Sequence, residues 1–184
     1  MSNLDTTHVI DRFLASNAEF ADTHEVAGLP LLPTGRTIIV GCVDPRVDPA
    51  LVMGLDLGQA AVIRNIGGRI TPATLRTLAL LAAITRSTGT RPGDDWNLVL
   101  VHHTDCGITR LLDIPDALAT ELGISPDALD PESISDPRVS LAVDIAALRA
   151  NPLLPPALVV SGLLYDTTTG RLETVVAPSA LGAT

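Results

Sequence analysis

The segment 37–46, with the sequence TIIVGCVDPR, decides the fold. Its first four residues, Thr37–Val40, form a β-branched apolar run that is typical of a strand buried on both faces. Three residues with reactive or charged side chains follow at once: Cys42, Asp44 and Arg46. The segment therefore predicts a buried strand whose carboxyl end carries chemistry.

Two more predicted strands end in the same way. Ala60–Ile63 leads into RNIGG at 64–68, and Leu98–Val101 leads into HHTDCG at 102–107. Because ligands of parallel sheets gather beyond the carboxyl ends of the strands, we expect all three segments to meet at one edge of the sheet.

The rest of the chain alternates between strands and helices. Further strands are expected at Ala157–Leu164 and, on the edge of the sheet, at Leu172–Val176. Helices are expected at Pro72–Ser87 and Arg138–Ala150, while Asp113–Pro137 is interpreted as short helical turns and surface loop. This order predicts an α/β fold: a mostly parallel four-stranded sheet plus a fifth edge strand, with helices on both faces.

An N-terminal helical arm is expected before this domain. Apolar residues at helical spacing precede the breaker-rich stretch 28–35; they are Val9, Ile10, Phe13 and Leu14. We expect residues 1–35 to form the arm and a linker, and residues 36–184 to form a single α/β domain.

Composition excludes several classes of function. The 184 residues can form a core without disulfides, and with 46% apolar but only 2% aromatic residues that core must be aliphatic. A formal net charge of −9 argues against a nucleic-acid partner. Neither a basic and apolar leader nor 18 uninterrupted apolar residues occurs, so we expect a cytoplasmic protein that does not bind membranes.

Both cysteines of the chain lie at the predicted sheet edge, together with a histidine. Thiolates and imidazole suit zinc, and the three ligands Cys42, His103 and Cys106 leave a fourth position open, as catalytic zinc sites require. The alternative is two buried free cysteines and a hydrogen-bonded histidine. The surrounding motifs favour one zinc ion per chain, which makes residues 36–184 a zinc-binding catalytic domain.

Neighbouring polar residues have plainer interpretations. Strand alternation turns His102 away from the metal, which favours a packing role. Asp105 is expected to cap or turn the loop from His103 to Cys106, or else to support a metal ligand through a hydrogen bond. Three basic residues on or beside the helix after the second strand are expected to form a solvated face; they are Arg69, Arg76 and Arg86.

The three motifs together resemble the β-carbonic anhydrase family. C-x-D-x-R, R-N-x-G and H-x-x-C-G occur in the order and approximate spacing of that family, over residues 36–176. The resemblance implies a zinc lyase (carbonate dehydratase) that is an obligate dimer or a dimer of dimers, with the arm packed on the partner subunit. Pro45 departs from the Ser or Ala of most relatives, and it should stiffen the neighbouring aspartate.

The resemblance also assigns roles. Asp44 would accept the hydrogen of zinc-bound hydroxide and aim its lone pair at carbon dioxide, and Arg46 would hold Asp44 ionised and off the metal. The alternative for this pair is a surface salt bridge. The segment after the second strand is expected to line the substrate pocket, with a plain tight turn as the alternative; its residues are Asn65, Ile66, Gly67 and Gly68.

The sequence is compatible with three functions. The leading one is reversible hydration of carbon dioxide to bicarbonate; the second is hydrolysis of carbonyl sulfide or carbon disulfide at the same zinc; the third is an inactive metal-binding or regulatory module. Some family members rest with the aspartate on the metal and often carry a tryptophan three residues before the first cysteine. Because that position is Ile39, we expect the open form, with water or hydroxide in the fourth position.

Overall fold

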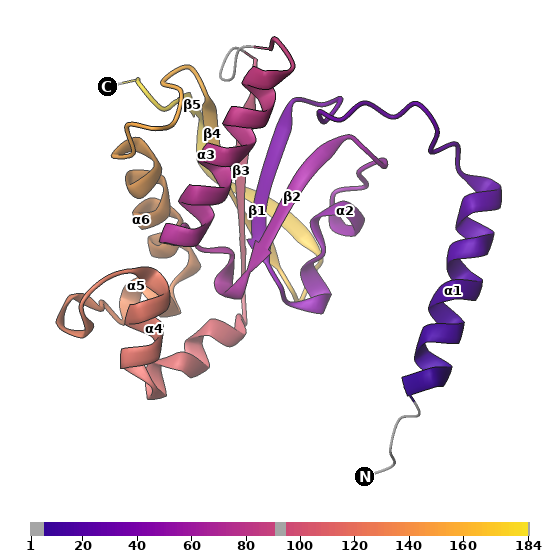
Figure 1. The fold of residues 1–184 in the computed structure, drawn as a ribbon. Helices are drawn as coiled ribbons and strands as arrows, with labels where there is room; N and C mark the ends of the chain where they lie inside the picture. Colours follow the sequence, from indigo (N-terminus) through magenta and orange to yellow (C-terminus); the bar gives the residue numbers. More distant parts are fainter. Residues whose placement is uncertain (1–5, 91–94, 184) are drawn as a thin grey trace. The chain divides into compact units, whose positions relative to one another are not determined.

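The computed structural model describes residues 6–90 and 95–183, so residues 1–5 of the expected arm lie outside the described part. The chain divides into two compact units, Met1–Leu31 and Leu32–Thr184. The first unit contains the helix α1 (Thr6–Thr23), which is drawn in indigo in Figure 1.

The second unit is built on a five-stranded sheet in the order β2-β1-β3-β4-β5. The strands are β1 (Thr37–Cys42), β2 (Ala60–Asn65), β3 (Asn97–His103), β4 (Val159–Asp166) and β5 (Arg171–Ala180). Every neighbouring pair is parallel except β4 and β5, which are antiparallel. The predicted four-stranded parallel sheet with a fifth edge strand is confirmed.

Helices connect the strands. The α-helices of this unit are α2 (Pro49–Val52), α3 (Pro72–Ser87), α4 (Pro115–Leu122), α5 (Glu132–Ser135) and α6 (Pro137–Arg149). Short 3-10 helices are η1 (Pro45–Val47), η2 (Ile66–Gly68), η3 (Gly107–Asp113) and η4 (Pro126–Ala128). The predicted helix Pro72–Ser87 is confirmed with the same bounds, and α6 begins and ends one residue earlier than predicted.

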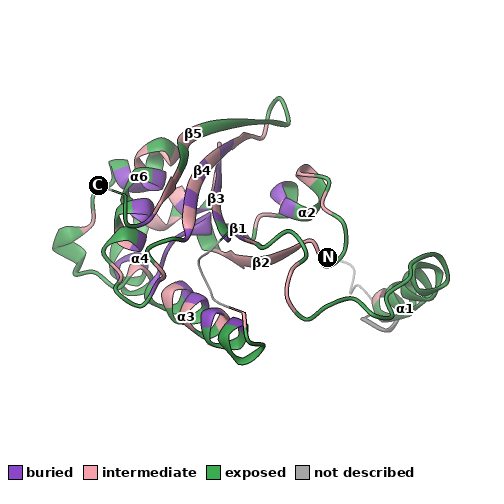
Figure 2. Ribbon diagram, turned by 90° about the horizontal axis from the view of Figure 1, so that it is seen from above, coloured by how far each residue is buried: buried purple, intermediate pink, exposed green. Residues whose placement is uncertain are grey.

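The main core lies between the sheet and the helices α3 and α6. Alternate residues of β1, β3 and β4 pack against apolar side chains of these helices. The strands contribute Ile38, Val40, Leu98, Leu100 and Val160, and the helices contribute Leu78, Leu141, Ile145 and Leu148. α2 lies on the other face, where the side chain of Pro49 packs directly over Gly41. Figure 2 shows the buried residues along the middle strands, between the helices. Helices therefore lie on both faces of the sheet, as predicted.

The register brings the three motif segments to one end of the sheet. Cys42 pairs with Asn65 at the ends of β1 and β2, and Gly41 pairs with Val101 two residues before the end of β3. The carboxyl ends of β1, β2 and β3 all lie at this end of the sheet, so the residues that follow these strands lie close together.

Candidate metal centre

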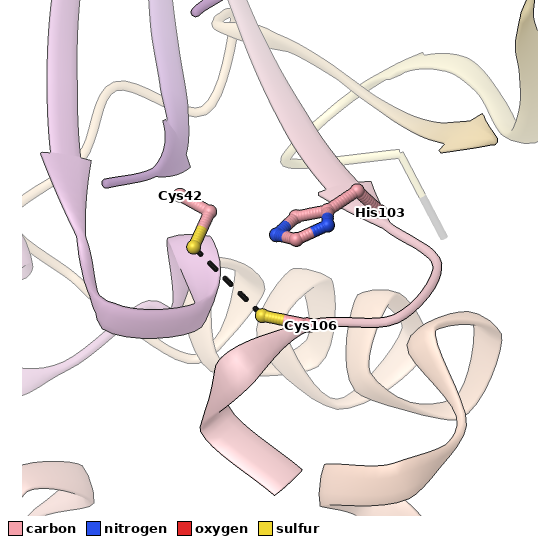
Figure 3. Close-up of side chains that lie close together, drawn as sticks. All are labelled: Cys42, His103 and Cys106. Carbon is pink, nitrogen blue, oxygen red and sulfur yellow. Dashed lines mark hydrogen bonds between the residues drawn. The ribbon is translucent and has the colours of Figure 1, made fainter. Parts of the chain in front are cut away.

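Three potential metal ligands converge where β1 and β3 end. Cys42 is the last residue of β1, His103 is the last residue of β3, and Cys106 stands directly before η3. Their ligand atoms all lie within 4.8 Å of one another, and the two sulfur atoms are 3.8 Å apart. Figure 3 shows the two sulfur atoms and the imidazole ring turned toward a common point.

The geometry of these side chains fits zinc. Tetrahedral zinc with Zn–S bonds of about 2.3 Å holds two thiolates about 3.8 Å apart, which is the separation found here. Nδ1 of His103 lies 2.9 Å from the carbonyl oxygen of Thr104, so Nδ1 donates and Nε2 keeps its lone pair. This Nε2 atom is buried and has no hydrogen-bond partner within the described ranges, which is the state expected of a ligand atom.

The two thiols differ in acidity. The hydrogen bond from Cys106 lowers the pKa of Cys42 to about 4, against the opposing effect of burial. The same hydrogen bond, together with burial, raises the pKa of Cys106. The backbone N–H groups of Asp44 and Gly67 further lower the pKa of Cys42, so the site is built to hold negative charge at this sulfur.

A carboxylate and a guanidinium group lie beside the ligands. Nε of Arg46 donates to Oδ1 of Asp44 at 3.0 Å, and Nη2 donates to Oδ2 at 2.7 Å. This bidentate pairing lowers the pKa of Asp44 to about 2. The backbone N–H of Asp44 lies 3.4 Å from the sulfur of Cys42. The ionised carboxylate is therefore carried by the loop that directly follows Cys42.

Arg46 also binds the loop that carries Cys106. Its Nη1 donates to the carboxylate of Asp105 at 2.8 Å, and its Nη2 donates to the backbone oxygen of Asp105 at 2.9 Å. Asp105 has a φ of 53°, which turns the chain between His103 and Cys106. The expected turn is present, and Arg46 in addition ties the two ligand-bearing loops together.

The structure adds Arg64 to the residues around the site. Its Nε donates to the carbonyl oxygen of Cys42 at 2.8 Å, and its Nη2 donates to that of Asp44 at 2.7 Å. Its Nη1 binds the carboxylate of Asp48. The position of Arg64 at the end of the neighbouring strand was the sequence signal for this contact.

The predicted substrate-pocket residues occupy the turn after β2. The side chain of Asn65 is bound to the backbone of Arg69, and Ile66 is 47% exposed. Gly67 and Gly68 both have positive φ, of 75° and 67°. The turn therefore depends on glycine at both positions.

A cavity of ≈ 150 Å³ adjoins the ligands on the side of α5 and α6. It is lined by Gly67, Arg69, His102, His103, Asp105, Cys106, Ile108, Thr109, Ile134, Ser135, Pro137 and Ser140. Of the four predicted substrate-pocket residues, Gly67 lines this cavity.

The prediction for Arg69 was wrong. Arg76 and Arg86 are exposed as predicted, but Arg69 is only 3% exposed. Its Nε donates to the buried carboxylate of Asp144 at 2.9 Å. A partner 75 residues away stabilises the buried charge, and the spacing of charges near the turn gave no sign of that partner.

Comparisons with known proteins agree with this geometry. The family model described as Carbonic anhydrase matches residues 37–132. Beta-carbonic anhydrase 1 of Mycobacterium tuberculosis is 33% identical over 169 residues, which cover 91% of this chain and 98% of that protein. The chain belongs to the β-carbonic anhydrase family. Membership confirms the resemblance found in the three motifs, and it makes the chain an enzyme of the lyase class.

One solved structure and one relative with a different printed activity are also similar to this chain. The crystal structure of carbonic anhydrase from Streptococcus mutans superposes with a TM-score of 0.70 and 35% identity, and the match covers 90% of this chain and 96% of that one. The carbon disulfide hydrolase of Acidithiobacillus thiooxidans is 28% identical, over 77% of this chain and 78% of that protein.

None of the helices within residues 6–90 and 95–183 is long and apolar enough to span a bilayer.

Proposed function

We propose that this β-carbonic anhydrase family member catalyses zinc-dependent, reversible hydration of carbon dioxide to bicarbonate. The observation that carries the proposal is the group of Cys42, Cys106 and the unpartnered Nε2 of His103, with an ionised carboxylate in the same loop as the first ligand. Zinc bound by two thiolates and an imidazole would lower the pKa of a water molecule and so supply a nucleophile near neutral pH.

Asp44 and Arg46 are proposed as the catalytic pair. The ionised carboxylate of Asp44 accepts a hydrogen bond from the nucleophilic water and thereby orients an oxygen lone pair toward carbon dioxide. Arg46 engages both oxygens of this carboxylate and keeps it within its own loop. Because Asp44 is engaged in this way, the geometry supports the open form, in which Asp44 is not a metal ligand.

The turn after β2 is proposed to line the substrate pocket. Gly67 supplies a backbone N–H near the sulfur of Cys42, and the absence of a side chain at Gly68 lets the turn approach the backbone of Cys42. Asn65 holds this turn in shape, and Ile66 offers an apolar surface beside it.

Hydrolysis of carbon disulfide or carbonyl sulfide is the second candidate. It is supported by the similarity to a carbon disulfide hydrolase, and the same ligands and the same catalytic pair would serve it. An inactive metal-binding module is less well supported, because Asp44 and Arg46 are both present and paired.

The assembly and location form part of the proposal. α1 exposes apolar side chains within the single chain, with Phe13 and Leu14 both 63% exposed, which supports an arm that packs on a second copy in a dimer or dimer of dimers. Two cysteine ligands must stay reduced, which favours the cytoplasm. Residues 1–35 are proposed as the arm and linker and 36–184 as the catalytic domain.

Stopped-flow assays of one zinc-analysed preparation against carbon dioxide, carbonyl sulfide and carbon disulfide test the proposal. We expect carbon dioxide hydration to dominate. Faster hydrolysis of either sulfur substrate would favour the second candidate, and no turnover of any substrate at full zinc occupancy would favour the inactive module.

A further inference from the structure

A buried ion pair lies behind the ligands and takes no part in the chemistry proposed above. Arg69 and Asp144 are each 3% exposed, and Nε of Arg69 lies 2.9 Å from Oδ2 of Asp144. His102, which is 2% exposed, places its Nε2 3.3 Å from the same carboxylate oxygen. One carboxylate on α6 therefore contacts two side chains from two different segments of the metal centre.

The first segment is the turn after β2. Asn65 clamps the backbone of Arg69, accepting from its N–H at 2.8 Å and donating to its carbonyl oxygen at 2.7 Å. Within this turn Gly68 lies so close to β1 that an added Cβ atom would come within 3.1 Å of the backbone nitrogen of Cys42. Anchoring Arg69 to Asp144 therefore fixes the turn against the strand that ends in a ligand.

The second segment is the end of β3. His102 immediately precedes His103, and its Nε2 lies 3.3 Å from both the carbonyl oxygen of Gly68 and the carboxylate of Asp144. Both neighbours are acceptors, so Nε2 carries the hydrogen. His102 thus joins the strand that carries His103 to the turn and to α6.

We propose that Asp144, acting through Arg69 and His102, is a positioning residue of the metal centre. It holds the Asn65–Arg69 turn against Cys42 and fixes the end of β3 that presents His103. The inference rests on the proposed zinc function. Apolar side chains could pack α6 equally well, whereas a carboxylate with two donors fixes the direction of both donor segments.

The test uses full-length protein loaded with zinc. The variants are Asp144→Asn, Arg69→Met and the double variant Arg69→Met/Asp144→Val, which removes the charge pair and keeps the site apolar. Arg138→Gln is the matched control, because it breaks the exposed ion pair between Arg138 on α6 and Glu173 on β5. Each protein is measured for thermal stability, for zinc release to a chromophoric chelator, and for the absorption spectrum of the cobalt(II) form.

We expect both single variants to be destabilised and to release zinc about 10- to 100-fold faster than wild type, because the loss of groups that orient metal ligands typically lowers metal affinity by that factor. The double variant should recover stability, because no unpaired charge remains, yet still release zinc faster and show shifted cobalt bands. The control should match wild type in all three measurements.

The measurements are made below the unfolding temperatures of the variants. If zinc release and the cobalt spectrum are unchanged in the double variant or in Asp144→Asn, the ion pair is only a packing element and the inference is overturned. Absence of zinc from wild-type protein would overturn the proposed function itself, and the positioning role with it.

Discussion

At the scale of single residues, the proposed chemistry depends on the pairing of Asp44 with Arg46. Asp44→Asn and Arg46→Ala should each keep zinc and lose turnover by a factor on the order of 10² or more. The losses should not multiply, because a carboxylate without Arg46 is free to swing onto the metal and block the open position. The double variant should therefore resemble the worse single variant, as residues that act as a unit do.

Carbon dioxide hydration and zinc content of the four proteins decide this prediction. Arg138→Gln serves as control, since it also removes a bidentate exposed ion pair, but one whose partner is Glu173 on β5. Full activity in either single variant at equal zinc occupancy would show that Asp44 and Arg46 form only a surface salt bridge.

The pH dependence should come from the metal centre and not from this pair. The pKa of Asp44 lies near 2 and that of Arg46 is raised above its usual value, so both stay charged between pH 6.5 and 9. A zinc site with two thiolates is formally neutral, so the rate should rise with pH through an apparent pKa above about 7, the value of three-histidine sites. A profile that is flat from pH 6.5 to 9 would contradict this.

The clustering of Cys42, His103 and Cys106 could be predicted from the sequence, whereas the pairing of Arg69 with Asp144 was not predicted. Cys42, His103 and Cys106 follow strand ends, and parallel strands bring such residues to one edge whatever the rest of the fold does. The burial of Arg69 depends on a helix far along the chain. One signal was available: Asp144 interrupts the apolar positions of α6 between Leu141 and Leu148, where a charge needs a partner.

At the scale of elements, the turn after β2 packs closely against β1, and this contact requires glycine at position 68. Gly68 has a φ of 67°, and an added Cβ atom would lie 3.0 to 3.1 Å from backbone atoms of Gly41, Cys42 and Val101, which cannot move aside. Gly68→Ala should therefore cost more than the roughly 1–2 kcal/mol of left-handed backbone alone, and it should weaken zinc binding.

Gly54→Ala is the matched control for this substitution. Gly54 has a φ of 64° with nothing within 4 Å of an added Cβ atom, so it isolates the cost of the backbone conformation. Denaturant unfolding and zinc affinity are measured for both variants. Equal stabilities and equal zinc affinities would contradict the close approach of the turn to β1.

Proline is compatible with two of the differences between the predicted and the observed elements. β5 runs through Pro178 to Ala180, beyond the predicted end at Val176, because an edge strand pairs on one side only and tolerates a missing N–H. α4 begins at Pro115 within a stretch predicted as turns and loop, because proline suits the first turn of a helix.

At the scale of the whole molecule, the exposed apolar side chains of α1 favour binding to a partner. Ile10 is also half exposed in the single chain, beside Phe13 and Leu14 on the same helix. We expect a dimer or dimer of dimers in sedimentation at low micromolar concentration, and weaker association after deletion of residues 1–27. A monomer that turns over at the full rate would contradict the proposed assembly.

The proposed function depends above all on a catalytic zinc ion held by Cys42, His103 and Cys106. X-ray absorption at the zinc edge, on dialysed protein of known metal content, tests it most directly. We expect about one zinc per chain with two sulfur ligands at about 2.3 Å and two lighter ligands, nitrogen or oxygen, at about 2.0 to 2.1 Å, and loss of one sulfur in Cys106→Ser. Less than about half a zinc ion per chain, or a zinc shell without sulfur, would contradict it.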